Sequence, residues 1–194
     1  MFHYKVNGEL ELRLFELRHA EILFALVEQN RDRLRAWLSW VDDSQSSQDT
    51  EKFIINSLQE FTSERGFAAG IWFHNQLVGS IGLHDISWSD RKATIGYWLS
   101  ETVEGKGIMT NACRAIINYA FQELKLHRMT IRVQPENHRS RAIPERLGFQ
   151  KEGILRQDNW MYDRYIDLIV YGLLADEWQC DRAGSLGIVV ETAR

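Results

Sequence analysis

Apolar and polar residues alternate in several short stretches of the chain, and this two-residue period predicts β-strands. Residues 10–15 and 128–133 show this period, and we expect further strands at residues 67–73, 77–83, 93–99, 149–156 and 165–172. Only His74, Asn75 and Gln76 separate the strand at 67–73 from the strand at 77–83, so the two should form a tight hairpin.

Other stretches repeat their apolar residues every three or four positions, which is typical of helices. We expect two helices between residues 20 and 40, with a break near Asn30, and a third that begins at Asp49 or Thr50 and ends before Gly66. Further helices are predicted at residues 108–125, 140–147 and 173–178. This order of elements predicts an α/β (α+β) fold with a mixed central β-sheet and helices on both faces.

Composition narrows the classes of protein to consider. A chain of 194 residues, 44% of them apolar, is long enough for one well-buried core, and we expect a single domain. The formal charge of −4 argues against direct nucleic-acid binding and favours a cationic partner. The apolar runs are too short for a membrane helix, and the first residues lack a secretion signal, so we expect a cytoplasmic protein. Cys113 and Cys180 have no ligand-spaced partners, so neither a disulfide nor a metal site is expected.

A glycine-bearing loop, residues 104–110, joins a predicted strand to a predicted helix. Gly105 and Gly107 allow the backbone to come close to a ligand. The first N–H groups of a helix have no acceptor within it, and the helix dipole is positive at that end. The loop therefore predicts an anion-binding site.

Three segments carry a family resemblance. Residues 104–109 partly match Gln/Arg-x-x-Gly-x-Gly/Ala, with Glu104 in the first position and Met109 in the last. Residues 137–149 are similar to Asn-x-x-Ser-x-x-x-x-Glu-x-x-Gly-Phe, and residues 95–99 resemble a strand with exposed backbone N–H groups. In these features the chain resembles the GCN5-related N-acetyltransferase superfamily, in its branch that acetylates ribosomal-protein N-termini. The resemblance covers residues 8–178, and residues 179–194 form a tail of uncertain structure.

The resemblance implies acetyl-CoA as co-substrate, with no metal. Its pyrophosphate would lie on the glycine loop and its pantetheine arm between the strands at 93–99 and 128–133. A backbone N–H between Tyr97 and Leu99 would stabilise the oxyanion. The expected cofactor-binding residues are Trp98, Leu99, Gly105, Lys106, Gly107, Ile108, Met109, Thr110, Asn111 and Asn137.

The resemblance also suggests catalytic groups. Many members have a proton-donating tyrosine where this chain has Pro144, so Ser140 inherits the role of hydroxyl donor to the thiolate. Asp158 is the first candidate for general base and Glu101 the second, with a water chain as the alternative for an α-amino group of pKa about 8. Structural roles stay open: Ser140 as a helix cap and Asp158 as a hairpin-end residue.

The acceptor side is predicted near the N-terminal helices. Trp37 and Trp40 are three residues apart on a predicted helix, and Asp42 follows, so these residues should form an aromatic and acidic lip. We expect an N-acetyltransferase in which the amine of a ribosomal-protein N-terminus attacks the thioester directly. The alternatives are a small-amine acetyltransferase, for a polyamine, amino acid or aminoglycoside, and a weakly catalytic acyl-CoA-binding domain. A homodimer is also open.

Overall fold

A computed structural model describes residues 3–178. Within them, one sheet of eight strands has the order β1-β2-β3-β4-β5-β6-β8-β7. The strands are β1 (His3–Lys5), β2 (Leu10–Leu14), β3 (Phe67–Phe73), β4 (Gln76–Ser87), β5 (Lys92–Leu99), β6 (Arg128–Val133), β7 (Gln150–Met161) and β8 (Arg164–Leu174). The predicted tail, residues 179–194, lies outside the described residues.

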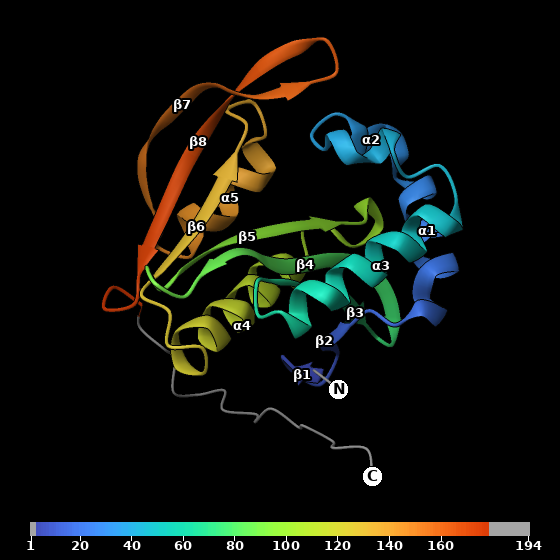
Figure 1. Ribbon diagram of the computed structural model, residues 1–194, viewed down its shortest axis with the longest axis horizontal. Coiled ribbons are helices and arrows are strands. Elements are labelled where there is room, and N and C mark those ends of the chain that lie inside the picture. Colours follow the sequence, from blue (N-terminus) through green and yellow to red (C-terminus); the bar gives the residue numbers. More distant parts are fainter. Residues whose placement is uncertain (1–2, 179–194) are drawn as a thin grey trace.

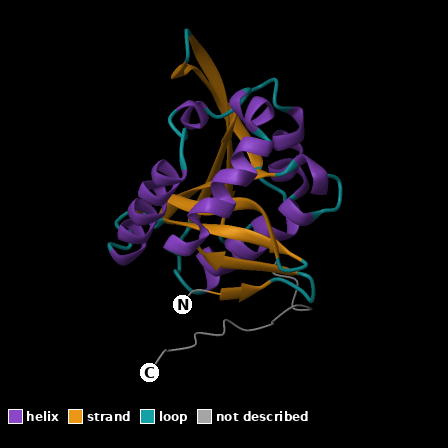
Figure 2. Cartoon of the chain, turned by 90° about the vertical axis from the view of Figure 1, so that its right-hand side faces the viewer, coloured by secondary structure: helices purple, strands orange, loops and turns teal. Residues whose placement is uncertain are grey.

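The helices are α1 (Ala20–Gln29), α2 (Arg31–Arg35), α3 (Ser47–Thr62), α4 (Ile108–Gln122) and α5 (His138–Arg146), with short 3-10 turns η1 (Leu17–His19), η2 (Ser39–Asp42) and η3 (Glu101–Val103). They cover both faces of the sheet, as predicted (Figure 2). In β3, Phe67, Ala69 and Ile71 belong to the core that includes α4, whereas Ala68 and Trp72 belong to the core with α1 and α3. Strand periodicity thus divides the apolar residues between two layers.

The two central strands separate along their length, and this opens the sheet. Parallel pairing between β5 and β6 extends only over residues 92–94 and 128–130. Beyond Thr94, β5 stays paired with β4, while β6 stays paired with β8 (Figure 1). The edge of β5 that would face β6 is therefore open from residue 95 to residue 99.

The last hairpin is long and irregular. Strand β7 lies at one edge of the sheet, and its register against β8 shifts between Lys151 and Gly153 and again between Leu155 and Asn159. Gln157, inside the second shift, has a φ of 52°, and its N–H donates to the Asp167 carboxylate at 2.8 Å. The residues of β7 are exposed as far as Trp160.

Several boundaries differ from the prediction. The third predicted helix is capped by Ser46, whose Oγ accepts from the N–H of Asp49 at 3.3 Å, so the helix starts before Asp49. The helix predicted at 173–178 is wrong, because β8 pairs with β6 as far as Leu174 and a turn follows. Strand β1 was not predicted. The hairpin after β3 is confirmed, although its turn has only His74 and Asn75, both with positive φ.

Candidate active site

The glycine loop places backbone, not side chains, around an open space. Gly105 and Gly107 have φ values of +75° and +74°, and Gly107 is the N-cap of α4. A Cβ added at either glycine would meet no atom within 4 Å. Ile108 and Met109, which follow, are buried in the core, so their backbone N–H groups lie at the loop while their side chains anchor it. Such a cradle fits a pyrophosphate group.

Three arginines gather beside this loop. Glu104 forms ion pairs with Arg33 of α2 and Arg139 of α5, and Arg33 also donates to the carbonyl of Leu99. Arg146 donates to the Thr110 hydroxyl at 3.0 Å. Sequence reasoning missed all three, although Arg139 and Arg146 lie inside the second motif. Their charge makes the loop suitable for an anion even though Glu104 stands where the family pattern has Gln or Arg.

The other predicted cofactor-binding residues differ in their exposure and in their contacts. Lys106 is exposed, with Nζ 5.9 Å from the centre of the Phe73 ring. Trp98 lies with its ring 6.3 Å from that of Trp40, and it packs against the core of α1 and α3. Asn111 is half-buried in the first turn of α4. Whether these side chains contact acetyl-CoA stays a prediction.

The second motif spans the whole of α5, from its N-cap Asn137 to Phe149. Asn137 is the N-cap, and its Oδ1 accepts from the Ser140 N–H at 3.1 Å. Ser140 is therefore not the cap. Its hydroxyl donates to the Tyr97 hydroxyl at 3.3 Å, and the Tyr97 hydroxyl donates to the Ser140 carbonyl at 3.1 Å. The sequence indicated a backbone role near Tyr97 but not this contact of its hydroxyl, because Tyr97 lies 43 positions from Ser140.

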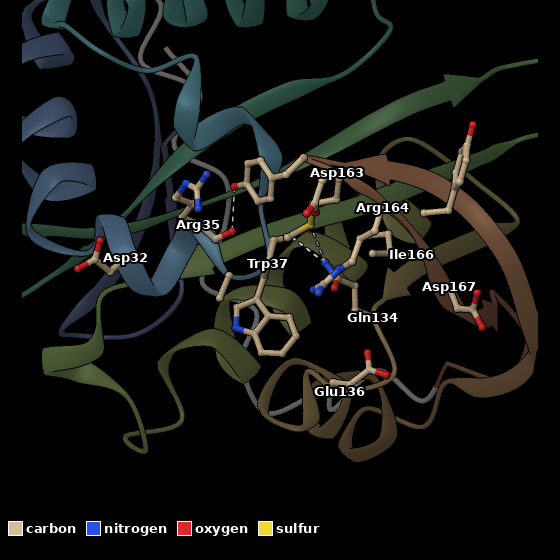
Figure 3. A pocket seen from close by; sticks show the side chains of 13 residues that line it. Asp32, Arg35, Trp37, Gln134, Glu136, Asp163, Arg164, Ile166 and Asp167 are labelled. Carbon is tan, nitrogen blue, oxygen red and sulfur yellow. Dashed lines mark hydrogen bonds between the residues drawn. The ribbon is translucent and has the colours of Figure 1, made fainter.

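A groove of about 800 Å³ lies between α2, the end of β6 and the turn that joins β7 to β8 (Figure 3). Its charged lining residues are the carboxylates Asp32, Glu136, Asp163 and Asp167 and the guanidinium groups Arg35 and Arg164. Trp37, one of the predicted acceptor residues, also lines it. The groove is thus aromatic and more acidic than basic.

Contacts across this groove join the last hairpin to the N-terminal helices. The Tyr162 hydroxyl donates to the Arg35 carbonyl at 2.9 Å, and the Arg35 guanidinium lies 4.2 Å from the centre of the Tyr162 ring. The side chain of Gln134, which is buried, donates to the Trp37 carbonyl at 3.1 Å. These contacts set the spacing between the two walls.

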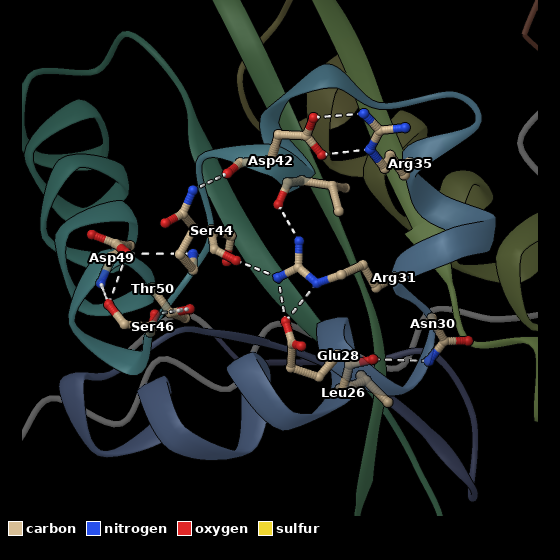
Figure 4. A network of polar contacts seen from close by, with 12 residues as sticks. Leu26, Glu28, Asn30, Arg31, Arg35, Asp42, Ser44, Ser46, Asp49 and Thr50 are labelled. Atoms are coloured by element: carbon tan, nitrogen blue, oxygen red, sulfur yellow. Dashed lines mark hydrogen bonds and ion pairs between the residues drawn. The ribbon is translucent and has the colours of Figure 1, made fainter.

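The predicted aromatic and acidic lip is wrong in its geometry. Helix α2 ends at Arg35, and Trp40 lies in η2, so Trp37 and Trp40 do not share a helix face. Trp40 instead lines a second cavity, of about 450 Å³, under α1 and α3. Asp42 pairs with Arg35 through two hydrogen bonds of 2.7 and 2.9 Å, and this guanidinium lowers the pKa of the carboxyl (Figure 4). The negative charge of Asp42 is therefore already in an ion pair with Arg35.

Both candidate bases are exposed carboxylates. Asp158 is exposed on β7, beside the irregular register at Gln157. Glu101 is exposed at the start of η3, and its backbone N–H donates to Asn30 Oδ1 at 3.0 Å. Neither carboxylate lines the groove or the second cavity. Both assignments stay predictions.

Two further observations concern residues 3–178. Among them, no three or more histidine, cysteine, aspartate or glutamate side chains are grouped so as to hold a metal ion. No helix in the same range has the length and apolar character needed to cross a membrane.

Comparison with known proteins agrees with this geometry. The family model described as Acetyltransferase (GNAT) domain matches residues 9–150. Putative ribosomal N-acetyltransferase YdaF of Bacillus subtilis (strain 168) is 41% identical over 94% of this chain and 100% of its own length. The ribosomal-protein-serine acetyltransferase of Escherichia coli (strain K12) is 32% identical over 89% of this chain and 96% of its own.

A solved structure extends the comparison to the bound donor. RimL, a ribosomal L7/L12 alpha-N-protein acetyltransferase in complex with coenzyme A, matches with a TM-score of 0.87 and 26% identity, covering 90% of this chain and 99% of RimL. The predicted fold and family are therefore confirmed. The chain belongs to the GNAT family, and it is an N-acetyltransferase that uses acetyl-CoA as its acyl donor.

Proposed function

We propose that this enzyme acetylates the α-amino group of a protein N-terminus, and specifically that of a ribosomal protein. The observation that carries the proposal is the groove between α2 and the β7–β8 turn. Its volume of about 800 Å³ is within the range of sites that enclose much of a ligand. An open groove suits an extended peptide end, whereas a small polyamine would be expected to need a closed pocket.

Charge supports the same acceptor. The carboxylates of Asp163 and Glu136 line the groove and are exposed, whereas Arg35 is already paired with Asp42. A free N-terminus is largely cationic at neutral pH, so these carboxylates would attract it. Two of the relatives are named for ribosomal-protein acetylation at serine or at an alpha-N position, and this is the acceptor class that we assign.

The donor side follows from the loop and the open edge of β5. We assign the pyrophosphate to the N–H groups at the start of α4, where Gly105 and Gly107 leave space. The N–H groups on the open edge of residues 97–99 would polarise the thioester carbonyl. Ser140 would give its hydroxyl proton to the leaving sulfur, and the amide group of Asn137 would contact the pantetheine arm.

A thiol-release assay tests the acceptor. Purified enzyme and acetyl-CoA are mixed with a serine-initiated L7/L12 peptide, the same peptide with a blocked α-amine, spermidine or an aminoglycoside. We expect turnover with the free peptide alone, and mass spectrometry should locate the acetyl group on the α-amine. Turnover with spermidine or the aminoglycoside, but not with the peptide, would refute the proposal.

Charge variants test the groove itself. Asp163→Asn and Glu136→Gln should each raise the KM for the peptide about twofold to fivefold at low salt, because an exposed charge pair contributes up to about 1 kcal/mol. Asp176→Asn, which changes an exposed carboxylate outside both cavities, is the matched control. A KM that moves equally in all variants, or in none, would contradict the assigned groove.

A further inference from the structure

Helix α5 contains a proline, and the proline changes the bonding of Ser140. In an α-helix the carbonyl of residue 140 would accept from the N–H of residue 144. Pro144 has no N–H, so this helical bond is missing. Without another donor the Ser140 carbonyl would be unsatisfied in a half-buried position.

Tyr97 supplies that donor from the opposite side of the opening between β5 and β6. Its hydroxyl donates to the Ser140 carbonyl at 3.1 Å and accepts from the Ser140 hydroxyl at 3.3 Å. The Ser140 N–H is held by Asn137 at 3.1 Å. Every polar group of Ser140 therefore has a partner, and Tyr97 accounts for two of them.

The surroundings keep the Tyr97 hydroxyl protonated. Burial raises the pKa of Tyr97 far above its ordinary value, and a thiolate at Cys113 nearby would raise it further. Cys113 is itself fully buried, and burial raises the pKa of its thiol, so no thiolate forms beside the pair. Across the working range of pH, Tyr97 remains a neutral hydrogen-bond donor.

We propose that Tyr97 is a positioning residue that fixes the Ser140 hydroxyl for protonation of the departing thiolate. The inference rests on the proposed role of Ser140 but not on the identity of the acceptor. During transfer the C–N bond forms and the C–S bond breaks, and the sulfur takes the Ser140 proton. Ser140 regains a proton from solvent, into which the acceptor nitrogen releases its own. The Tyr97 hydroxyl holds the Ser140 Oγ in place until the serine O–H bond turns toward the sulfur, and it keeps its separate bond to the Ser140 carbonyl.

Tyr97→Phe tests the proposal, with Tyr171→Phe as matched control. The Tyr171 hydroxyl is also buried and also contacts α5, donating to Glu145 at 2.7 Å and accepting from Arg141 at 3.3 Å. We expect Tyr97→Phe to lower kcat about tenfold, the loss that one neutral hydrogen bond represents, with less than about a twofold change in KM for acetyl-CoA. Tyr171→Phe should leave kcat unchanged.

Pro144→Ala separates positioning from structural support. In the Tyr97→Phe background, an alanine N–H at residue 144 can satisfy the Ser140 carbonyl. The double variant should therefore regain thermal stability but not turnover. Recovery of turnover would show that Tyr97 only satisfies a carbonyl, and would overturn the proposal, as would equal kcat values for Tyr97→Phe and Tyr171→Phe.

The acceptor assignment and this inference fail independently. Departure of the thiolate is common to every amine, so the loss in Tyr97→Phe should have the same size with a peptide or with spermidine, whichever proves to be the acceptor. Ser140→Ala should reduce kcat at least as much, and adding Tyr97→Phe to it should cause little further loss, because both act on one group. If the double variant instead loses kcat by the product of the two single losses, Tyr97 and Ser140 act independently, and the proposal is refuted.

Discussion

One methyl group at Gly107 tests the proposed donor loop. This glycine is the left-handed N-cap of α4, with a φ of 74° and a ψ of 2°. An alanine in that conformation costs about 1–2 kcal/mol. Its Cβ would meet no protein atom within 4 Å, so no clash adds to this strain. Gly107→Ala should therefore fold, with its free energy of unfolding lowered by about 1–2 kcal/mol, measured by urea denaturation.

The effect on ligand binding should be larger. The added Cβ would enter the open space to which we assign the pyrophosphate. If it displaces one backbone hydrogen bond to a charged oxygen, the loss is about 1.5–3 kcal/mol. This loss corresponds to a dissociation constant for CoA raised about 10- to 100-fold. Isothermal titration calorimetry of the folded variant measures this change directly.

Gly148 provides the matched control. It also has a positive φ, +83°, and a Cβ there would also meet nothing within 4 Å, but it follows α5 instead of preceding α4. Gly148→Ala should lose the same stability, about 1–2 kcal/mol, and should keep its affinity for CoA. Equal CoA affinities for Gly107→Ala and Gly148→Ala would refute the assignment of the loop.

Two other substitutions give clear expectations. Glu104→Gln breaks partly exposed ion pairs with Arg33 and Arg139, which contribute about 0–1 kcal/mol each, and it leaves both cations free for phosphate, so CoA affinity should not fall. A tenfold loss by calorimetry would contradict this. For His84, burial lowers the pKa of the imidazole, whereas Glu60 and Asp85 oppose the shift. Below pH about 6.5 the unfolded chain thus binds a proton that the folded chain does not, and stability falls. His84→Asn should lessen the stability lost between pH 7.5 and 5.5 in urea unfolding, and an unchanged loss would exclude His84 as its source.

The fold was largely predictable because its elements carry strong local patterns. In β2 the two-residue period reflects a core on one face of the sheet, whereas the nearly continuous apolar run of β3 reflects cores on both faces. The errors lie where local patterns are weak. The stretch 173–178 reads as a helix, but pairing with β6 keeps Leu173 and Leu174 in a strand. The side chain of Ser46 caps α3, although Asp49 and Thr50 are also common cap residues.

The site was only partly predictable because its contacts join distant segments. The glycine loop and Asn137 belong to motifs of neighbouring residues, so the sequence alone identifies them. Proline has no backbone N–H, so the gap at Pro144 is also evident from the sequence. The hydroxyl that replaces that N–H comes from Tyr97, which no local spacing relates to α5. In the same way, the pairing of Asp42 with Arg35 depends on how the chain turns after α2.

The two register shifts in β7 have a consequence for how copies of this enzyme can meet. An outer strand with a regular row of free N–H and C=O groups invites strand addition and aggregation. Here the row is interrupted at Gly153 and again around Gln157, whose left-handed backbone bends the strand. A second copy would find no continuous ladder to extend. A dimer formed through this edge would have to use exposed side chains such as Ile154 and Trp160. Extension of the sheet from one copy to the next is therefore disfavoured.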